Sequence, residues 1–250
     1  MAEPTRDWQR FAFDVDIARW AEAADKVATA VLADPAQADQ YRYAKTWFVG
    51  VDALPNAEDG HVEGVPLKGP VIDQLAHDHW HSAQLSVTFP GYPQPMDGES
   101  VGQHRFRTQR DAAHVDGLLP HGPARRRHLI EPHAFILGLP LNDSDQSPLV
   151  VWEGSADILR AAFRQALSDH TPEEWSQIDL TEPYQAARKH CFETCARVEL
   201  SARPGEALLL HRLTLHGVAP WQDMRPFPQG RRIAYFRPHL ADPSDWLDLP

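Results

Sequence analysis

Beyond residue 80 the chain is a succession of short apolar segments separated by turns that contain proline or glycine. This feature constrains the fold most, because short apolar segments between such turns are typical of β-strands. A series of many short strands predicts a sandwich or an open barrel. We expect strands over residues 83–89, 101–109, 128–139, 149–152, 196–201, 206–210 and 231–238.

Helical signals precede these strands and interrupt them once. In residues 14–33 the apolar side chains recur at the spacing of one helix face. Thr171, followed by Pro172 and Glu174, is typical of a capped helix start. We expect helices over residues 14–33, 66–77 and 155–168 and from 171 onward, and a further strand over 46–54.

The chain of 250 residues predicts a single domain over 1–250, since no repeat and no clear linker divides it. We expect residues 1–80 to form a mostly helical N-terminal support and residues 100–240 to form the β core. A helical insertion over residues 155–195 interrupts that core and is a candidate for part of a substrate pocket or an oligomer contact. The fold is therefore expected to be mainly β with flanking helices.

Charge and cysteine content exclude several classes of protein. The 24 Lys and Arg residues against 35 Asp and Glu give a net charge of −11, so we expect no nucleic-acid partner. No segment approaches the roughly 20 apolar residues of a membrane helix, and the N-terminus lacks the pattern of a signal peptide. Two cysteines, Cys191 and Cys195, favour reduced thiols. We therefore expect a cytoplasmic protein with no membrane partner.

The triplet His114-Val115-Asp116 is the first candidate for chemistry. In an extended segment the side chains two residues apart project to the same face, which places an imidazole beside a carboxylate. A non-haem Fe(II) site needs this pair and one further histidine. With 14 histidines in 250 residues, roughly one such triplet is expected by chance, so the triplet alone proves little.

Two downstream features give the triplet weight. His216 is followed by Gly217 and lies just beyond a buried apolar strand, where a side chain can enter a site. Arg231 and Arg232 then open the last predicted strand. A buried arginine beside a metal cleft needs an anion, because an unpaired buried charge is costly.

With these features in this order, the chain resembles the Fe(II)/2-oxoglutarate-dependent oxygenases, and within them the phytanoyl-CoA dioxygenase-like branch. The resemblance covers roughly residues 100–240. It includes the segment 147–155, where that branch has an apolar strand followed by Pro-Gly-Ser-His. Glu153 and Ala156 replace the Pro and the His of this motif, which indicates a divergent subgroup.

The resemblance implies a double-stranded β-helix (jelly-roll, cupin-like) core and a catalytic site with an Fe(II) ion held by His114, Asp116 and His216. It also implies 2-oxoglutarate and O2 as co-substrates, with decarboxylation of 2-oxoglutarate to succinate. Arg231 would bind the far carboxylate of 2-oxoglutarate; Arg232, on the opposite face of the strand, is the alternative. The substrate is a small molecule that is hydroxylated or otherwise oxidised. The related halogenases have Gly or Ala at the position of Asp116, so a carboxylate there favours hydroxylation.

Other interpretations stay open at this point. The run from His77 through His79 to His81 is a candidate ligand set for a cupin-type metalloenzyme that does not use 2-oxoglutarate. A non-catalytic binding protein on the oxygenase fold is a second alternative. The triplet from His61 to Glu63 has suitable ligand types but lies in a stretch rich in glycine and proline that predicts a surface loop.

Arginines concentrate around the triplet. Residues 105–128 contain six arginines and two acids, a local charge of +4 in a chain of −11. They predict either an anionic substrate or ordinary salt bridges to acidic neighbours. The six are Arg105, Arg107, Arg110, Arg125, Arg126 and Arg127.

Overall fold

A large antiparallel sheet forms the centre of the computed structural model, which describes residues 6–75, 77–223 and 227–249. Its seven strands have the order β1-β10-β7-β12-β4-β3-β2, and each neighbouring pair is antiparallel. The strands are β1 (Trp8–Phe11), β2 (Tyr41–Arg42), β3 (Trp47–Phe48), β4 (Gln84–Thr88), β7 (Phe135–Pro140), β10 (Ala207–His211) and β12 (Arg231–Phe236).

A smaller antiparallel sheet, with strand order β11-β8-β9, faces the large one. Its strands are β8 (Leu149–Glu153), β9 (Ala196–Leu200) and β11 (His216–Val218), and a separate hairpin joins β5 (Leu118–His121) to β6 (Arg126–Leu129). Apolar side chains of β7, β10 and β12 pack between the sheets against those of β8 and β9. This is the double-stranded β-helix (jelly-roll) arrangement, mainly β with flanking helices, as expected from the sequence.

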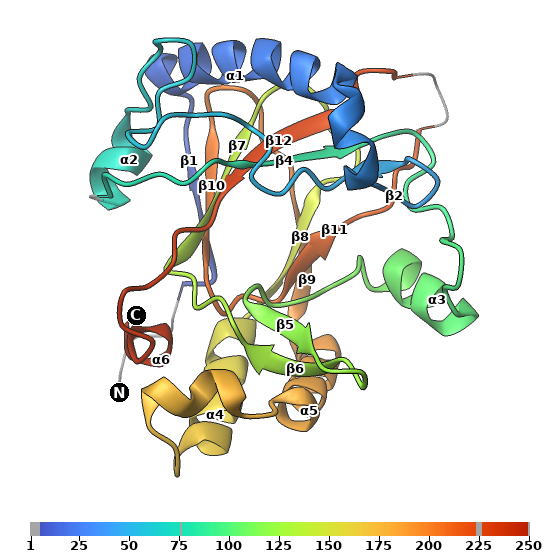
Figure 1. Ribbon diagram of the computed structural model, residues 1–250, viewed down its shortest axis with the longest axis vertical. Coiled ribbons are helices and arrows are strands. Elements are labelled where there is room, and N and C mark those ends of the chain that lie inside the picture. The colour runs from blue at the N-terminus through green and yellow to red at the C-terminus, as the bar shows by residue number, and fades with distance from the viewer. Residues whose placement is uncertain (1–5, 76, 224–226, 250) are drawn as a thin grey trace.

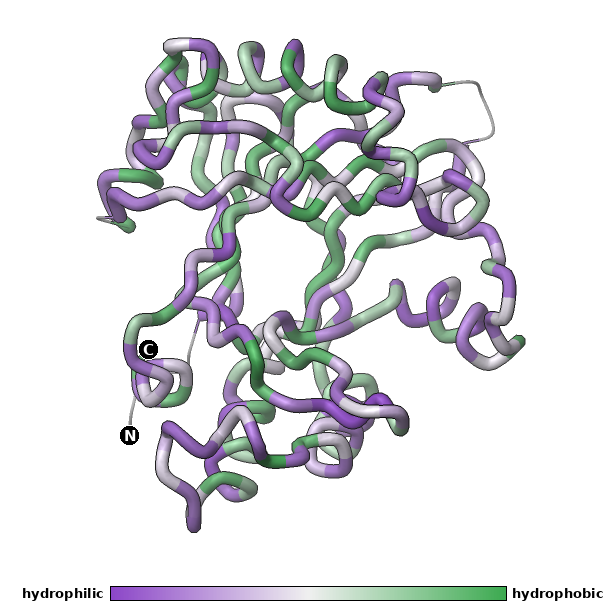
Figure 2. Tube along the Cα trace, in the orientation of Figure 1, coloured by the Kyte–Doolittle hydropathy of each residue, from purple (hydrophilic) through white to green (hydrophobic). Residues whose placement is uncertain are grey.

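Helix α1 (Val15–Ala33) covers the outer face of the large sheet, as Figure 1 shows at the top of the molecule. Asp14 caps it by accepting hydrogen bonds from the backbone N–H groups of Asp16 and Ile17. Its apolar stripe, visible as green segments among purple ones in Figure 2, buries Trp20 and Ala24 in the cluster that includes Phe236. Burial of that stripe explains why the periodicity of residues 14–33 predicted this helix correctly.

The remaining long helices lie together at the other end of the molecule (Figure 1). Helix α4 (Ser155–Leu167) packs against α5 (Thr181–Thr194), with the 3-10 helix η2 (Pro172–Gln177) between them in sequence. The short α6 (Asp245–Asp248) contacts α4 through Trp246, whose ring lies 5.0 Å from that of Phe163. The predicted insertion over 155–195 is therefore a helical layer.

The strand expected over 101–109 is wrong, because these residues form helix α3 (Val101–Gln109). Ser100 and Gln103 make a reciprocal capping box at its start, which satisfies two backbone donors that a strand would have paired elsewhere. None of its residues is buried, so no apolar face opposes the local helix signal. The expected strand over 128–139 is also interrupted, since residues 130–134, which include Pro132, separate β6 from β7.

The N-terminal region contributes more strand than expected. Strands β1, β2 and β3 join the large sheet, so the β core extends beyond residues 100–240. Only Trp47 and Phe48 of the expected strand 46–54 pair as β3. The expected helix 66–77 is confirmed over α2 (Pro70–Leu75), while Ala76 lies outside the described residues, and a 3-10 helix η1 (Pro35–Gln40) follows α1. Among the described helices, none combines the length and apolar character that a bilayer crossing requires.

Candidate metal centre

Two histidines face each other between the sheets across an isolated antiparallel bridge. The backbone N–H of His114 donates to the carbonyl of His216 at 2.8 Å, and that of His216 donates back to His114 at 3.0 Å. This exchange fixes the two side chains beside each other, with ring centroids 4.7 Å apart. Residues 102 positions apart in sequence thus form one imidazole pair, at the start of β11.

Backbone carbonyls orient both rings in the same way. Nδ1 of His114 lies 3.0 Å from the carbonyl of Ala112, and Nδ1 of His216 lies 2.9 Å from that of Thr214. A carbonyl accepts only, so each Nδ1 is assigned a proton and each Nε2 is turned toward Asp116. The Nε2 atoms lie 3.1 Å (His114) and 3.8 Å (His216) from the carboxylate of Asp116. Imidazoles held in this way are typical of metal ligands.

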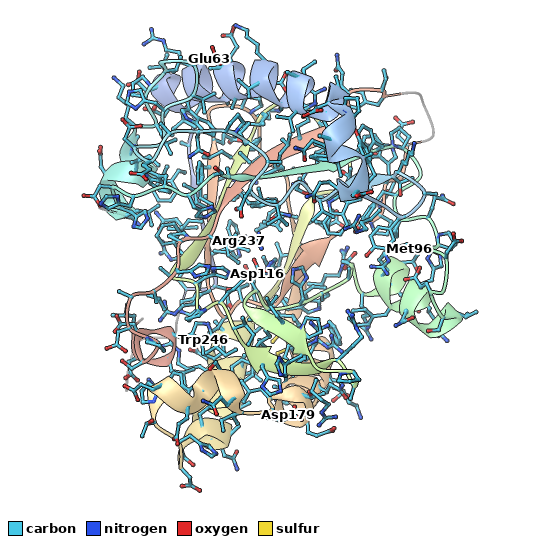
Figure 3. All side chains as sticks on the ribbon, viewed as in Figure 1. Glu63, Met96, Asp116, Asp179, Arg237 and Trp246 are labelled. Carbon is cyan, nitrogen blue, oxygen red and sulfur yellow. The ribbon has the colours of Figure 1, made fainter. Side chains whose placement is uncertain are left out.

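Asp116 is the carboxylate of the group, and Arg237 holds its other side. Nη1 of Arg237 lies 3.3 Å from Oδ2 of Asp116, and Figure 3 shows the two residues together near the middle of the molecule. Burial alone raises the pKa of Asp116, but the charge of Arg237 and the hydrogen bond from His114 together hold it well below its ordinary value. Asp116 is therefore ionised near neutral pH, as a metal ligand must be.

The two histidines differ in their proton affinity. Burial lowers the pKa of His216 to about 4, so its imidazole is neutral near neutral pH. For His114, burial acts in the same direction, but the hydrogen bond and the charge of Asp116 outweigh it and raise the pKa. The side chain of His114 is half exposed while those of His216 and Asp116 are buried, so the group is open to solvent on one side.

Close backbone packing supports this group from behind. A Cβ on Gly217 would lie 2.1 Å from the carbonyl oxygen of Asp111, so the segment that leads to His114 approaches β11 closely only because residue 217 is glycine. Ser155, at the start of α4, accepts a hydrogen bond from the backbone N–H of Leu215 at 2.9 Å. The buried Asp7 in turn accepts one from Ala156 at 2.9 Å. Asp7 thus holds the first turn of α4 in place.

The group opens into a cavity of about 890 Å³. The large sheet lines it with Tyr235, the small sheet with Leu149, and helix α5 with Tyr184 and Arg188, and Arg237 lines it just after β12. Residues of the insertion 155–195 therefore lie in the cavity wall, while an oligomer contact by this insertion stays a prediction. The volume is in the range of small-molecule sites.

The two arginines that open β12 have different surroundings. Arg232 turns outward to α1, where its Nη1 lies 2.9 Å from Oδ1 of Asp25 and 2.8 Å from the hydroxyl of Thr29. Arg231 turns inward and is buried, and its Nη1 has no hydrogen-bond partner among the described residues. It lines a small hollow of about 10 Å³ to which Tyr235 also contributes. The guanidinium of Arg232 therefore faces α1, on the side of the sheet opposite to Arg231.

The competing histidine runs do not converge. The ring of His77 packs against Trp80 with centroids 5.0 Å apart, and His81 directs Nδ1 at the carbonyl of Ser82 at 2.7 Å. Neither they nor the exposed His79 belong to a group of potential metal ligands in the described part of the chain. His61 lies in a loop, as the sequence predicted, and its Nδ1 lies 2.9 Å from the carboxylate of Asp59.

Sequence reasoning missed a second group of potential ligands, formed by Glu131, His133 and His239. Glu131 and His133 are an acid and a histidine two residues apart, in the reverse order of the triplet His114–Asp116, and that spacing is a signal that could have drawn attention. It also missed the contact of Arg237 with Asp116. The alternation of side chains along β12 from Arg231 was the available signal, since it places Arg237 on the inward face.

No protein-family model and no curated protein matches the chain. Among solved structures it is similar to EctD from S. alaskensis with 2-oxoglutarate and 5-hydroxyectoine, at 16% identity over 93% of this chain and 71% of that one, with a TM-score of 0.44. AviO1 from Streptomyces viridochromogenes Tue57 is 13% identical over 96% and 92% of the two chains, with a TM-score of 0.49. The non-heme iron oxygenase OrfP, in complex with Fe and alpha-ketoglutaric acid, is 16% identical over 42% and 44%, with a TM-score of 0.29. Similarity this distant adds nothing on function, which rests on the chain's own residues.

Proposed function

We propose that the chain is a non-haem Fe(II)- and 2-oxoglutarate-dependent dioxygenase that hydroxylates or otherwise oxidises a small molecule. One observation carries the proposal: His114, Asp116 and His216 direct two imidazole Nε2 atoms and a carboxylate at one point in a cavity. Two histidines and one carboxylate on one side of an ion leave the other positions free, as Fe(II) oxygenases require.

The chain's own residues prepare this chemistry. The bridge between His114 and His216 sets the imidazole pair, and Arg237 keeps the Asp116 carboxylate ionised and in place. Fe(II) with 2-oxoglutarate and O2 would supply the oxidative decarboxylation to succinate and the oxidation of a C–H bond. The buried Nη1 of Arg231, which has no hydrogen-bond partner among the described residues, is a fitting donor for the far carboxylate of 2-oxoglutarate.

Three alternatives are less well supported. Halogenation is disfavoured because Asp116 supplies a carboxylate where a halogenase leaves a position free for chloride. A cupin-type site at His77, His79 and His81 is disfavoured because those side chains do not converge. A non-catalytic binding protein is disfavoured because that role does not explain why both imidazoles are oriented toward Asp116. A cytoplasmic location, the absence of nucleic-acid and membrane partners, and any oligomer stay predictions.

Two arginines of the cavity favour an anionic substrate. Arg127 and Arg188 both line it, and neither forms an ion pair with an acidic side chain among the described residues. Burial first, and then the charges of Arg188 and Arg125, lower the pKa of Arg127. By contrast, Arg107 pairs with Glu99, and Arg126 pairs with Asp179 and Glu182. Of the arginines that line the cavity, Arg127 and Arg188 are therefore the two without an acidic partner among the described residues.

Inorganic phosphate tests this substrate class without knowledge of the substrate. We expect phosphate to raise the Tm of the wild type, because it binds the folded cavity. The rise should shrink in Arg188→Met and be retained in the matched control Arg126→Met, whose arginine is already paired outside the cavity. Equal rises in both variants would assign the effect to general salt binding and remove the support for an anionic substrate.

Anaerobic titration with Fe(II) and 2-oxoglutarate tests the proposed function. Binding of 2-oxoglutarate to bound iron produces a visible charge-transfer band, which we expect in the wild type, not in His216→Ala, and more weakly in Arg231→Met. Exposed His79 lies outside the group, so His79→Ala is the matched control and should retain the band. An unaltered band in His114→Ala would exclude the proposed metal site, and iron binding without any response to 2-oxoglutarate would favour an enzyme of another class.

A further inference from the structure

A second group of ligand-type side chains lies where the segment between β6 and β7 meets the segment after β12. Glu131, His133 and His239 bring one carboxylate oxygen and two imidazole nitrogens within 4.8 Å of one another. His133 and His239 face each other across an isolated antiparallel bridge, with ring centroids 5.0 Å apart. The two segments are further joined by hydrogen bonds from Ala134 to the carbonyl of Pro238 at 2.8 Å and from Leu240 to that of Pro132 at 2.7 Å.

The state of His133 points to a missing ligand. Its side chain is only 4% exposed, yet neither ring nitrogen makes a hydrogen bond of normal geometry with a described residue. Buried polar groups are nearly always satisfied, so an unsatisfied one indicates an absent ion or water. Its Nε2 lies 3.5 Å from Oε2 of Glu131. Two ligand atoms bound tetrahedrally to Zn²⁺ at about 2.1 Å lie about 3.4 Å apart, which this separation matches.

We propose that Glu131, His133 and His239 form a second divalent-cation site, of the zinc type, that is distinct from the group of His114, Asp116 and His216. Two imidazoles and a carboxylate suit Zn²⁺, with one position left for water. His239 is exposed and Glu131 is partly exposed, so an ion can enter from solvent. Arg237 lies near the site, but its guanidinium donates a hydrogen bond to Asp116, and this carboxylate offsets the positive charge of Arg237.

The site would connect the cavity wall to the C-terminal segment. Glu131 lines the cavity, and His239 precedes the C-terminal segment that ends in α6. A bound ion would tie these segments together and so hold the rim of the cavity and the start of the C-terminal segment in one geometry. The role assigned to this ion is therefore positional, not oxidative.

Zinc stoichiometry of the chelator-treated full chain tests the proposal. Equilibrium dialysis against Zn²⁺ should give two ions per chain for the wild type and one for His239→Ala, Glu131→Gln or His114→Ala. The double variant His114→Ala/His239→Ala should bind none, and the control His79→Ala should bind two. Zn²⁺ should also raise the Tm of His114→Ala, which retains only the second site, and leave that of the double variant unchanged.

The outcomes separate this site from the proposed function. Zinc binding to His239→Ala and Glu131→Gln at the wild-type stoichiometry would overturn the second site. A wild type that binds one ion, lost in His239→Ala and retained in His114→Ala, would support the second site and contradict the proposed oxygenase centre. The side chain of His114 is half exposed and His239 is exposed, which limits the effect of both histidine substitutions on folding.

Discussion

Two groups of ligand-type side chains in this chain share one backbone device. In each, two histidines more than 100 residues apart face each other across an isolated antiparallel bridge: His114 with His216, and His133 with His239. In each, a carboxylate two residues from one histidine completes the group, Asp116 in the first and Glu131 in the second. The bridge brings the imidazoles together, and the short spacing adds the acid.

The groups differ in how their polar atoms are satisfied. In the first, both Nδ1 atoms face carbonyls and the carboxylate contacts Arg237. In the second, both nitrogens of His133 are buried without such partners, and burial lowers the pKa of His133 to about 4. The first group is therefore organised before an ion arrives, as catalysis requires, while the second would gain order from the ion itself.

The largest expected effect comes from removing one ligand of the organised group. His216→Ala should lower 2-oxoglutarate turnover by about 1,000-fold or more, because the loss of one of three protein ligands removes the metal on which the reaction depends. Succinate formation in the presence of Fe(II), ascorbate and O2 measures this. His79→Ala, which changes an exposed histidine outside both groups, should keep full turnover. Comparable activity in the two variants would end the assignment of the first group to catalysis.

The next effect separates the two faces of β12. Arg231→Met should raise the KM for 2-oxoglutarate by roughly 10- to 100-fold, since a charge-assisted hydrogen bond contributes about 1.5–3 kcal/mol. Arg232→Met should leave this KM unchanged and lower stability instead, because Arg232 binds Asp25 on the outer face. A rise of this KM in Arg237→Met but not in Arg231→Met would assign the binding of 2-oxoglutarate to Arg237, which lines the cavity.

The sequence predicted the elements in which local pattern and tertiary packing agree. Helices α1 and α4 carry apolar stripes that are buried, and strands β4, β8, β9, β10 and β12 lie where short apolar segments predicted them. Residues 101–109 form a helix and not the expected strand because Ser100 and Gln103 supply a capping box and none of these residues is buried. Strands β2 and β3 have two residues each, too few for a period to be recognised.

The candidate site was predictable in part for a similar reason. His114 and Asp116 are close in sequence, and the glycine after His216 marked a strand boundary, so the structure brings together three residues that the sequence had singled out. The pairing of His133 with His239 depends on where residue 239 returns to residue 133, which only the tertiary fold determines. The contact between Arg237 and Asp116 has the same origin.

Two glycines offer a sharper test of the comparison. Gly217→Ala would force its Cβ against the Asp111 carbonyl behind the first group, and should weaken Zn²⁺ binding there by at least about 10-fold, as displacement of supporting contacts does. Gly117 has φ +84°, and a Cβ there would lie 2.2 Å from the carbonyl oxygen of Glu131. Gly117→Ala should therefore weaken both groups. Zinc titration of each variant checks this, and a loss at both groups in Gly217→Ala would contradict their independence.

His211 provides the smallest effect and a contrast with both groups, because cations surround it instead of a carboxylate. Its Nδ1 accepts a hydrogen bond from the Leu213 N–H at 3.0 Å, and its Nε2 lies 2.8 Å from Nη2 of Arg160. Burial, and then the charges of Arg212 and Arg160, lower its pKa to about 3. With arginines as its charged neighbours, His211 is not placed to bind a metal ion. Its protonation should therefore change the stability of the fold and not the binding of metal.

The direction in which stability changes with pH follows from the lowered pKa of His211. Below about pH 6.5 the unfolded chain binds a proton at residue 211, while the folded chain does so only near pH 3, so stability is lost as pH falls through this window. Between pH 7 and pH 5 the loss should be about 1–2 kcal/mol, measured by urea unfolding. His211→Asn, which keeps an acceptor for Leu213, should remove that part of the loss, and His79→Asn should follow the wild type. If the free energy of unfolding of His211→Asn falls with pH as steeply as that of the wild type, the acid sensitivity lies in the two bridged histidine pairs. Saturating Zn²⁺ should then suppress this fall.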